Sequence, residues 1–313
     1  MKFSHSNYND IYAMDQISGT ITVADTINGF DKDLGNPVLQ HLNNIVTQDN
    51  EIITYYIADD RLKTQYPNLN FQLSKQQTAN LYQQLINYTR HPELNYKNFV
   101  CSFNGSSHVS RRLLVAIIEK FGWYNATTVS KNFTFTVDEM DGYIEDMVGD
   151  RSSFYRKFFI GDNSESYFAT TNSFGWNRYD HATNIQTLSE KLAQSFVHIV
   201  SESLSDSYYP YYGEKFLYSV VTRGLFVAWA HPRWHEYLEK HYGFKLYRRL
   251  FDYTFDQIEN PVQRLVELMT MLAKFSVLTP AEWHDLYLLE QDTIEYNYDH
   301  YFSGNYMKCL ERY

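Results

Sequence analysis

Two glutamates and a lysine stand where a predicted sheet could carry out chemistry. Residues 196–201 form an apolar run that predicts a buried strand, and Glu202 follows it. After a polar segment, Glu214 and Lys215 open a helical pattern, and residues 225–230 predict the next strand. Ligands of open α/β sheets bind outside the carboxyl ends of the strands. A helix N-terminus with a lysine there suits a diphosphate, whereas in the simpler interpretation Glu214 favours the helix dipole and Lys215 is a solvated residue.

A second polar turn follows the predicted strand 98–103. Asn104 and His108 lie between this strand and a predicted helix that carries Arg111 and Arg112 in its first turn. His108 could act as a base or as a hydrogen-bond donor, and either arginine could neutralise a departing diphosphate. The alternative is a serine N-cap followed by two exposed arginines.

Other motifs point away from metal and dinucleotide chemistry. His231 and His235 have the spacing of a metal pair, but no glutamate follows the first histidine as in zinc proteases. Asp59 and Asp60 read as a turn at a strand end. Glycine-rich phosphate loops are absent from the sequence, which disfavours kinases and dehydrogenases. We therefore expect no metal and no cofactor.

Three segments carry a resemblance to a known family: Ser201-Glu202-Ser203, Gly213-Glu214-Lys215-Phe216 and residues 226–232. In this order they resemble the donor-binding region of α-1,3-fucosyltransferases and of related GT-B-type glycosyltransferases of bacteria and viruses. The resemblance covers residues 195–242. It departs at Ser203, where an asparagine is common, and at Gly213, where a threonine is common.

The resemblance implies a metal-independent glycosyltransferase that uses a nucleotide-sugar donor, with a GDP-sugar as one candidate, and a glycan, protein or other acceptor. It implies that Glu214 contacts the ribose, that Lys215 contacts the phosphates and that Glu202 lies near the reacting centre. We expect Glu202 to be the catalytic base, with His108 as second choice. The expected donor-binding residues are Glu214, Lys215, Asn104, Arg111, Arg112 and Ser201.

Strand and helix patterns alternate through the first half, which predicts a doubly wound parallel sheet. Strands are expected at 20–25, 51–58, 69–73, 98–103, 196–201, 225–230 and 244–247. Helices are expected at 37–47, 74–89, 109–121, 188–193, 214–223 and 232–240, with a helical tail from 261 and a helix behind the Thr279-Pro280 cap. Residues 126–180 are expected to form loops with short elements over a cleft. The fold class is thus α/β with two Rossmann-like lobes (GT-B-like), an acceptor-side domain at 1–185 and a donor-binding domain at 186–313.

The composition and net charge limit the kinds of partner that this chain can bind. The 313 residues are 44% apolar, enough for a core, and the formal charge of −10 disfavours binding to a nucleic-acid backbone. The two cysteines lie far apart in sequence, and no apolar run is long enough to span a bilayer, so a cytoplasmic protein is expected. Two alternatives stay open. The first is a non-catalytic viral or structural protein that retains a transferase-like fold, and the second is a transferase that glycosylates modified DNA bases.

Overall fold

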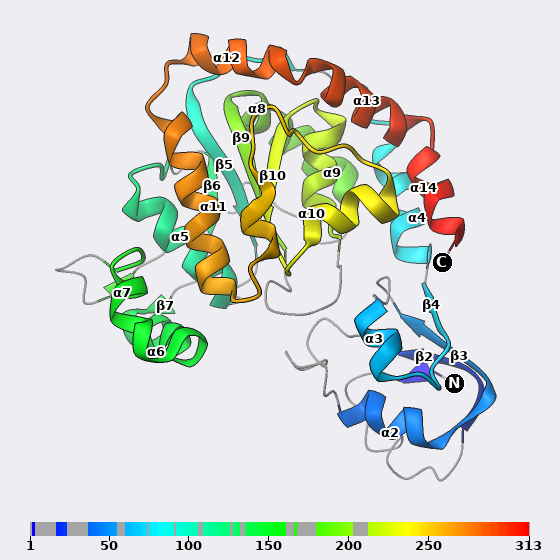
Figure 1. Cartoon of the computed structure of the whole chain (residues 1–313). Coiled ribbons are helices and arrows are strands. Elements are labelled where there is room, and N and C mark those ends of the chain that lie inside the picture. Colours follow the sequence, from blue (N-terminus) through cyan, green and yellow to red (C-terminus); the bar gives the residue numbers. More distant parts are fainter. Residues whose placement is uncertain are drawn as a thin grey trace.

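The computed structural model shows a mixed α/β protein built on parallel sheets (Figure 1). It describes residues 2–3, 17–23, 37–54, 60–73, 75–90, 92–105, 109–125, 128–131, 135–160, 166–167, 180–202 and 212–312. Within these ranges the strands form two four-stranded parallel sheets and one antiparallel pair, β7 (Phe135–Thr136) and β8 (Ser166–Tyr167). The expected α/β class is confirmed.

The main sheet has the strand order β10-β9-β5-β6. Its strands are β5 (Asn98–Asn104), β6 (Val129–Lys131), β9 (Ser195–Ser201) and β10 (Leu225–Trp229). All of their pairings are parallel, so their carboxyl ends meet at one edge. Every residue of β9 and β10 is buried, which explains why these strands read as nearly continuous apolar runs.

Helices surround this sheet or pack on the helices that do (Figure 1). They are α4 (Lys75–Leu85), α5 (Val109–Lys120), α6 (Val137–Val148), α7 (Ser152–Arg156), α8 (His181–Ala193), α9 (Glu214–Val221), α10 (Trp234–Tyr237), α11 (Pro261–Ser276), α12 (Pro280–Leu289), α13 (Gln291–Phe302) and α14 (Asn305–Cys309). A π-helical turn (Leu238–Tyr242) and short 3-10 turns (Gly149–Arg151, Tyr253–Gln257 and Leu310–Arg312) complete the set. Residues 113–118 of α5 are fully buried, because this central stretch of the helix is apolar on all sides.

Aromatic side chains close the amino end of the main sheet. The Trp283 ring of α12 stacks on Phe196, with ring centroids 5.8 Å apart, and lies 5.8 Å from Phe99. Phe99 and Phe196 are the second residues of β5 and β9. The Trp283 indole N–H donates to the Phe275 carbonyl oxygen at 2.8 Å, so its polar atom is satisfied. The amino end of the sheet is therefore packed and apolar, so we look for a polar site at the carboxyl end.

The last helices of the chain pack on α4. The Tyr82 ring of α4 lies 5.5 Å from the Tyr301 ring of α13 and 5.8 Å from the Tyr306 ring of α14. The Tyr306 hydroxyl also reaches the Thr78 carbonyl oxygen at 3.4 Å. Residues more than two hundred positions apart thus share one aromatic cluster.

The second sheet has the order β1-β2-β3-β4 and belongs to the N-terminal part of the chain. Its elements are β1 (Lys2–Phe3), β2 (Ile17–Val23), α2 (Pro37–Ile45), β3 (Val46–Thr54), α3 (Asp60–Gln65) and β4 (Phe71–Leu73). The buried Asn50 side chain donates to the carbonyl oxygens of Thr47 and Asn68 and accepts from the Asn70 N–H, at 2.7 to 3.0 Å. Figure 1 shows this sheet with α2 and α3 (blue) beside the larger body.

The expected domain boundary after residue 185 does not separate the two sheets. It falls inside α8 (His181–Ala193). β5, from the expected first domain, pairs directly with β9, from the expected second domain. The described elements pass from one sheet to the other between β4 and α4 instead. Residues on both sides of the expected boundary therefore build one sheet and one core.

Most of the expected strands are confirmed within the described residues. β2, β3, β4, β5, β9 and β10 match the expectations for 20–25, 51–58, 69–73, 98–103, 196–201 and 225–230. The expected helix after Ser74 is α4, and the expected helix at 37–47 is α2. Residues 24–25 and 55–58 and the expected Ser74 cap lie outside the described residues.

Two expectations were wrong. Residues 126–180 were expected to form loops with short elements, but α6 runs for 12 residues and begins with a capping box between Thr136 and Glu139. Residues 244–247 were expected to form a strand, but they pair with no strand among the described residues. The Asn297 side chain takes the place of a neighbouring strand there, since it accepts from the Lys245 N–H at 2.7 Å and donates to the Lys245 carbonyl oxygen at 2.9 Å.

None of the helices in the described ranges combines the length and the apolar character needed to cross a bilayer.

Candidate functional site

Asn104 and Ser201 meet at the carboxyl edge of the main sheet. They end the neighbouring strands β5 and β9, and the Ser201 hydroxyl donates to the Asn104 side-chain oxygen at 2.7 Å. The Asn104 amide in turn donates to the Ser102 hydroxyl at 3.1 Å. Both Asn104 and Ser201 are fully buried. Their side chains therefore link two strands and form the floor of this edge.

The two adjacent arginines of α5 differ in their partners. Arg111 is buried and donates to the Ser201 carbonyl oxygen at 3.2 Å, so its guanidinium belongs to the edge. Arg112 forms an ion pair with Glu139 of α6 at 2.9 Å. The structure thus brings Arg111 to the expected donor site and pairs Arg112 with a different element.

Glu202 lies directly after β9 and is 1% exposed. Its Oε1 accepts the Gly213 N–H at 2.9 Å, which places the carboxyl group on the N-cap of α9. Its Oε2 is buried and has no hydrogen-bond partner among the described residues. A buried carboxylate oxygen without a donor is costly, because nothing replaces the water that it has lost.

Burial raises the pKa of the Glu202 carboxyl to about 7. The Lys215 charge lowers this pKa, the Glu214 charge raises it, and the Gly213 N–H and the Arg111 charge lower it by smaller amounts. Loss of hydration of the buried carboxylate raises the pKa by more than the nearby cations lower it. Glu202 can therefore change its protonation state close to neutral pH.

The close approach of Glu202 depends on a glycine. A Cβ added to Gly213 would stand 2.7 Å from Glu202 Oε2, inside van der Waals contact. Gly213→Ala is therefore expected to displace the carboxyl group and to lower the free energy of unfolding by about 1–3 kcal/mol. Urea unfolding measures this loss. Gly224→Ala is the matched control, since its Cβ would meet nothing closer than 3.6 Å. Equal losses in the two variants would contradict the proposed contact.

Glu214 and Lys215 form a buried ion pair in the first turn of α9. Lys215 Nζ lies 2.7 Å from Glu214 Oε1, and their side chains are 7% and 14% exposed. Burial alone would raise the pKa of Glu214, but the charge and hydrogen bond of Lys215 bring it down to about 2. Glu214 therefore stays ionised, and its carboxylate offsets part of the positive field of Lys215 and of the helix N-terminus.

His181 belongs to this cluster, although nothing in the sequence analysis singled it out. It is the first residue of α8, and its Nδ1 lies 2.7 Å from the hydroxyl of Tyr218, one turn along α9 from Glu214. Burial lowers the pKa of His181, Glu214 raises it and Lys215 lowers it. The sequence feature that could have located His181 is Asp180. This residue caps α8 by accepting the Thr183 N–H and so places His181 at the start of the helix.

The structure thus brings six of the eight expected site residues together around one strand end: Asn104, Arg111, Ser201, Glu202, Glu214 and Lys215. Arg112 is directed to α6 instead. His108, the second candidate for the base, lies outside the described residues, as does Ser203. Within the described ranges, no group of three or more His, Cys, Asp or Glu side chains is arranged to hold a metal ion.

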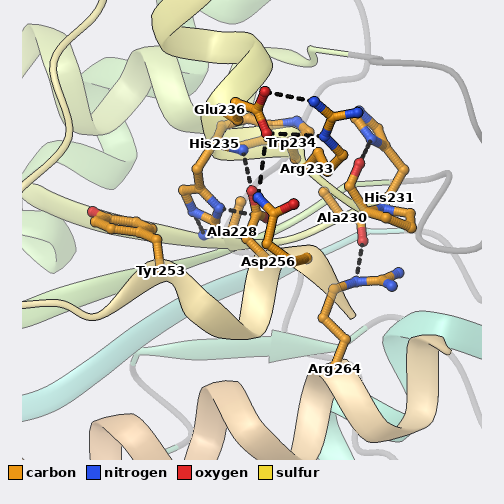
Figure 2. A network of polar contacts seen from close by, with 12 residues as sticks. Ala228, Ala230, His231, Arg233, Trp234, His235, Glu236, Tyr253, Asp256 and Arg264 are labelled. Atoms are coloured by element: carbon orange, nitrogen blue, oxygen red, sulfur yellow. Dashed lines mark hydrogen bonds and ion pairs between the residues drawn. The ribbon is translucent and has the colours of Figure 1, made fainter. Parts of the chain in front are cut away.

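The two histidines with metal-like spacing have different surroundings (Figure 2). The Ala228 N–H donates to His235 Nε2 at 3.0 Å, so Nε2 carries no proton. Nδ1 therefore carries the proton and donates to Asp256 Oδ1 at 2.8 Å, while Asp256 Oδ2 accepts the His235 backbone N–H at 2.9 Å. Both ring nitrogens of His235 are used, so this side chain fastens α10 to the Tyr253–Gln257 turn. His231 Nδ1 lies 2.8 Å from the Pro232 carbonyl oxygen.

Arg264 of α11 stabilises the end of β10 from the other side. Its Nε donates to the Ala230 carbonyl oxygen at 3.0 Å, and its Nη1 donates to the carbonyl oxygens of Ile258 and Glu259 (Figure 2 shows the Ala230 bond). Arg264 is 1% exposed. This arginine and the His235–Asp256 pair fix the chain after β10, and with it one wall of the carboxyl edge.

Comparison of the chain with models of protein families, with curated proteins and with solved structures gives no match.

Proposed function

We propose that this chain is a glycosyltransferase that takes its sugar from a nucleotide-sugar donor. One arrangement carries the proposal: the Glu214–Lys215 pair begins α9 beside Glu202, at the carboxyl end of a central parallel strand. Open α/β sheets bind ligands at this edge, and a helix N-terminus with a lysine suits a diphosphate. The resemblance of residues 195–242 to the donor region of α-1,3-fucosyltransferases assigns the same residues to the donor.

In this proposal the ammonium of Lys215 and the guanidinium of Arg111 face the diphosphate, and the Glu214 carboxylate accepts hydrogen bonds from the ribose hydroxyls. The two cations stabilise the departing nucleotide diphosphate without a metal. We further propose the GT-B-like arrangement of two Rossmann-like lobes. The parallel N-terminal sheet would form the acceptor side, and the larger body would hold the donor.

The test is a thermal-unfolding screen with GDP, UDP, dTDP, CMP and their common sugars. A bound nucleotide at a hundred times its Kd stabilises the folded state by about 2.7 kcal/mol, which predicts a rise in Tm of a few degrees. The double variant Glu214→Gln/Lys215→Met is expected to abolish the rise. It removes both charges of the ion pair together, so neither partner is left as an unpaired buried charge.

The exposed Lys274→Ala, in the last turn of α11, is the control and should keep the full rise. A rise that survives in the double variant would show that nucleotides bind elsewhere. If the folded wild-type protein responds to no nucleotide, the proposal is wrong and a non-catalytic protein that retains the fold is favoured.

A further inference from the structure

One carboxyl oxygen of Glu202 is buried at the proposed donor site without a hydrogen bond to any described residue. Its carboxyl group rests on the N-cap of α9, with Oε1 bonded to the Gly213 N–H and Oε2 without a partner among the described residues. Protonation of Oε2 removes the buried charge and creates an O–H donor. That donor then needs an acceptor, and a phosphate or sugar oxygen bound at the helix N-terminus would provide one.

The charged groups around Glu202 come from several elements. Glu214 and Lys215 face it from α9, and Arg111 faces it from α5. Tyr212, just before α9, interacts with it as well, and burial raises the pKa of the Tyr212 hydroxyl, so it stays neutral. Burial lowers the pKa of His181, which favours its neutral form, so with Glu202 ionised two carboxylates oppose two cations and the cluster has no net positive charge. A dianionic diphosphate is therefore accommodated better when Glu202 is neutral.

We propose that Glu202 binds the nucleotide-sugar diphosphate as a carboxylic acid, taking up a proton from solvent when the ligand binds and donating a hydrogen bond from Oε2. The inference rests on the proposed function. The proton moves from water or buffer to Oε2, and no other bond is made or broken. The negative ligand shifts this equilibrium because it disfavours a second negative charge beside it.

One mechanistic consequence concerns the base. A carboxyl group that is protonated in the donor complex cannot accept the proton of the acceptor hydroxyl. The role of catalytic base expected for Glu202 from the sequence then falls to another group. Glu202 becomes a donor-binding residue, and Glu202→Gln mimics its working form.

The experiment is titration calorimetry with GDP-mannose and UDP-glucose, whose diphosphates do not titrate between pH 6 and 8.5. Repeating the titration at pH 7.5 in buffers of different ionisation enthalpy gives the number of protons taken up. A free-state pKa of about 7 predicts an uptake of roughly 0.7 proton for the wild-type protein. The same linkage predicts binding at least about tenfold weaker at pH 8.5 than at pH 6.

Glu202→Gln should bind the same nucleotide sugar with no proton uptake and with an affinity that is independent of pH. Glu267→Gln, an exposed change on α11, is the control and should keep the wild-type uptake. Wild-type binding without proton uptake overturns this inference and leaves the proposed function standing. No binding of any nucleotide overturns the proposed function and this inference together. If Glu202→Gln does not fold, the wild-type proton count and pH dependence still decide.

Discussion

Asp256→Ala is expected to lower the free energy of unfolding by about 3–5 kcal/mol. The Asp256 carboxylate accepts both the ring Nδ1–H and the backbone N–H of His235. Both residues are almost fully buried, so water does not replace the lost acceptor. Each buried donor left without a partner costs about 1–3 kcal/mol. Urea unfolding followed by tryptophan fluorescence gives the loss.

Asp252→Ala is the matched control for this variant. Asp252 caps the same short turn and accepts the Thr254 N–H at 3.0 Å, but it is exposed. Its loss should be much smaller, since water can solvate the freed N–H. Equal losses for Asp252→Ala and Asp256→Ala would mean that the bonds to His235 add nothing beyond an ordinary cap.

Glu202→Gln is expected to flatten the dependence of stability on pH. In the wild-type protein the pKa of Glu202 rises from an ordinary value near 4.5 to about 7 on folding. A group whose pKa is raised in the folded state contributes stability that is full below the unfolded pKa and is lost as pH rises through the folded pKa. This shift predicts that the wild-type protein loses roughly 2–3 kcal/mol, relative to Glu202→Gln, between pH 5 and pH 8.

Unfolding free energies of the two proteins at several pH values check this difference. Histidines that titrate in the same range contribute equally to both and cancel in the comparison. Glu267→Gln should follow the wild-type curve. Parallel curves for the wild-type protein and Glu202→Gln would show that the pKa of the carboxyl group keeps its ordinary value in the folded protein despite its burial.

The parts of the fold that the sequence predicted best are the buried parallel strands. β9 and β10 lie wholly in the core, so hydrophobicity alone marks them. α6 was missed although Val137, Met140, Ile144 and Val148 share its buried face, because polar and aromatic residues between them hide the period. The strand expected at 244–247 depended on a partner that local patterns do not reveal, since Asn297 supplies its hydrogen bonds from more than fifty residues away.

The candidate site was predictable to the extent that sheet topology determines it. Parallel strands bring their carboxyl ends together, so Asn104, Ser201 and Glu202 had to meet once β5 and β9 paired. His181 reaches the cluster from the start of a separate helix, and its place is set by the packing of α8 against α9. The pairing of Arg112 with Glu139 depends on α6, which no clear pattern in the sequence predicts.

The aromatic cluster that joins Tyr82 to Tyr301 and Tyr306 has a consequence for biosynthesis. α4 leaves the ribosome early, yet its covering partners are made more than two hundred residues later. Until then the Tyr82 ring lacks these two aromatic partners. In the main sheet, one edge of β5 likewise stays unpaired until β9 has been synthesised. The Tyr82 cluster is therefore completed only after Tyr301 and Tyr306 have left the ribosome, so this part of the larger body is among the last to fold.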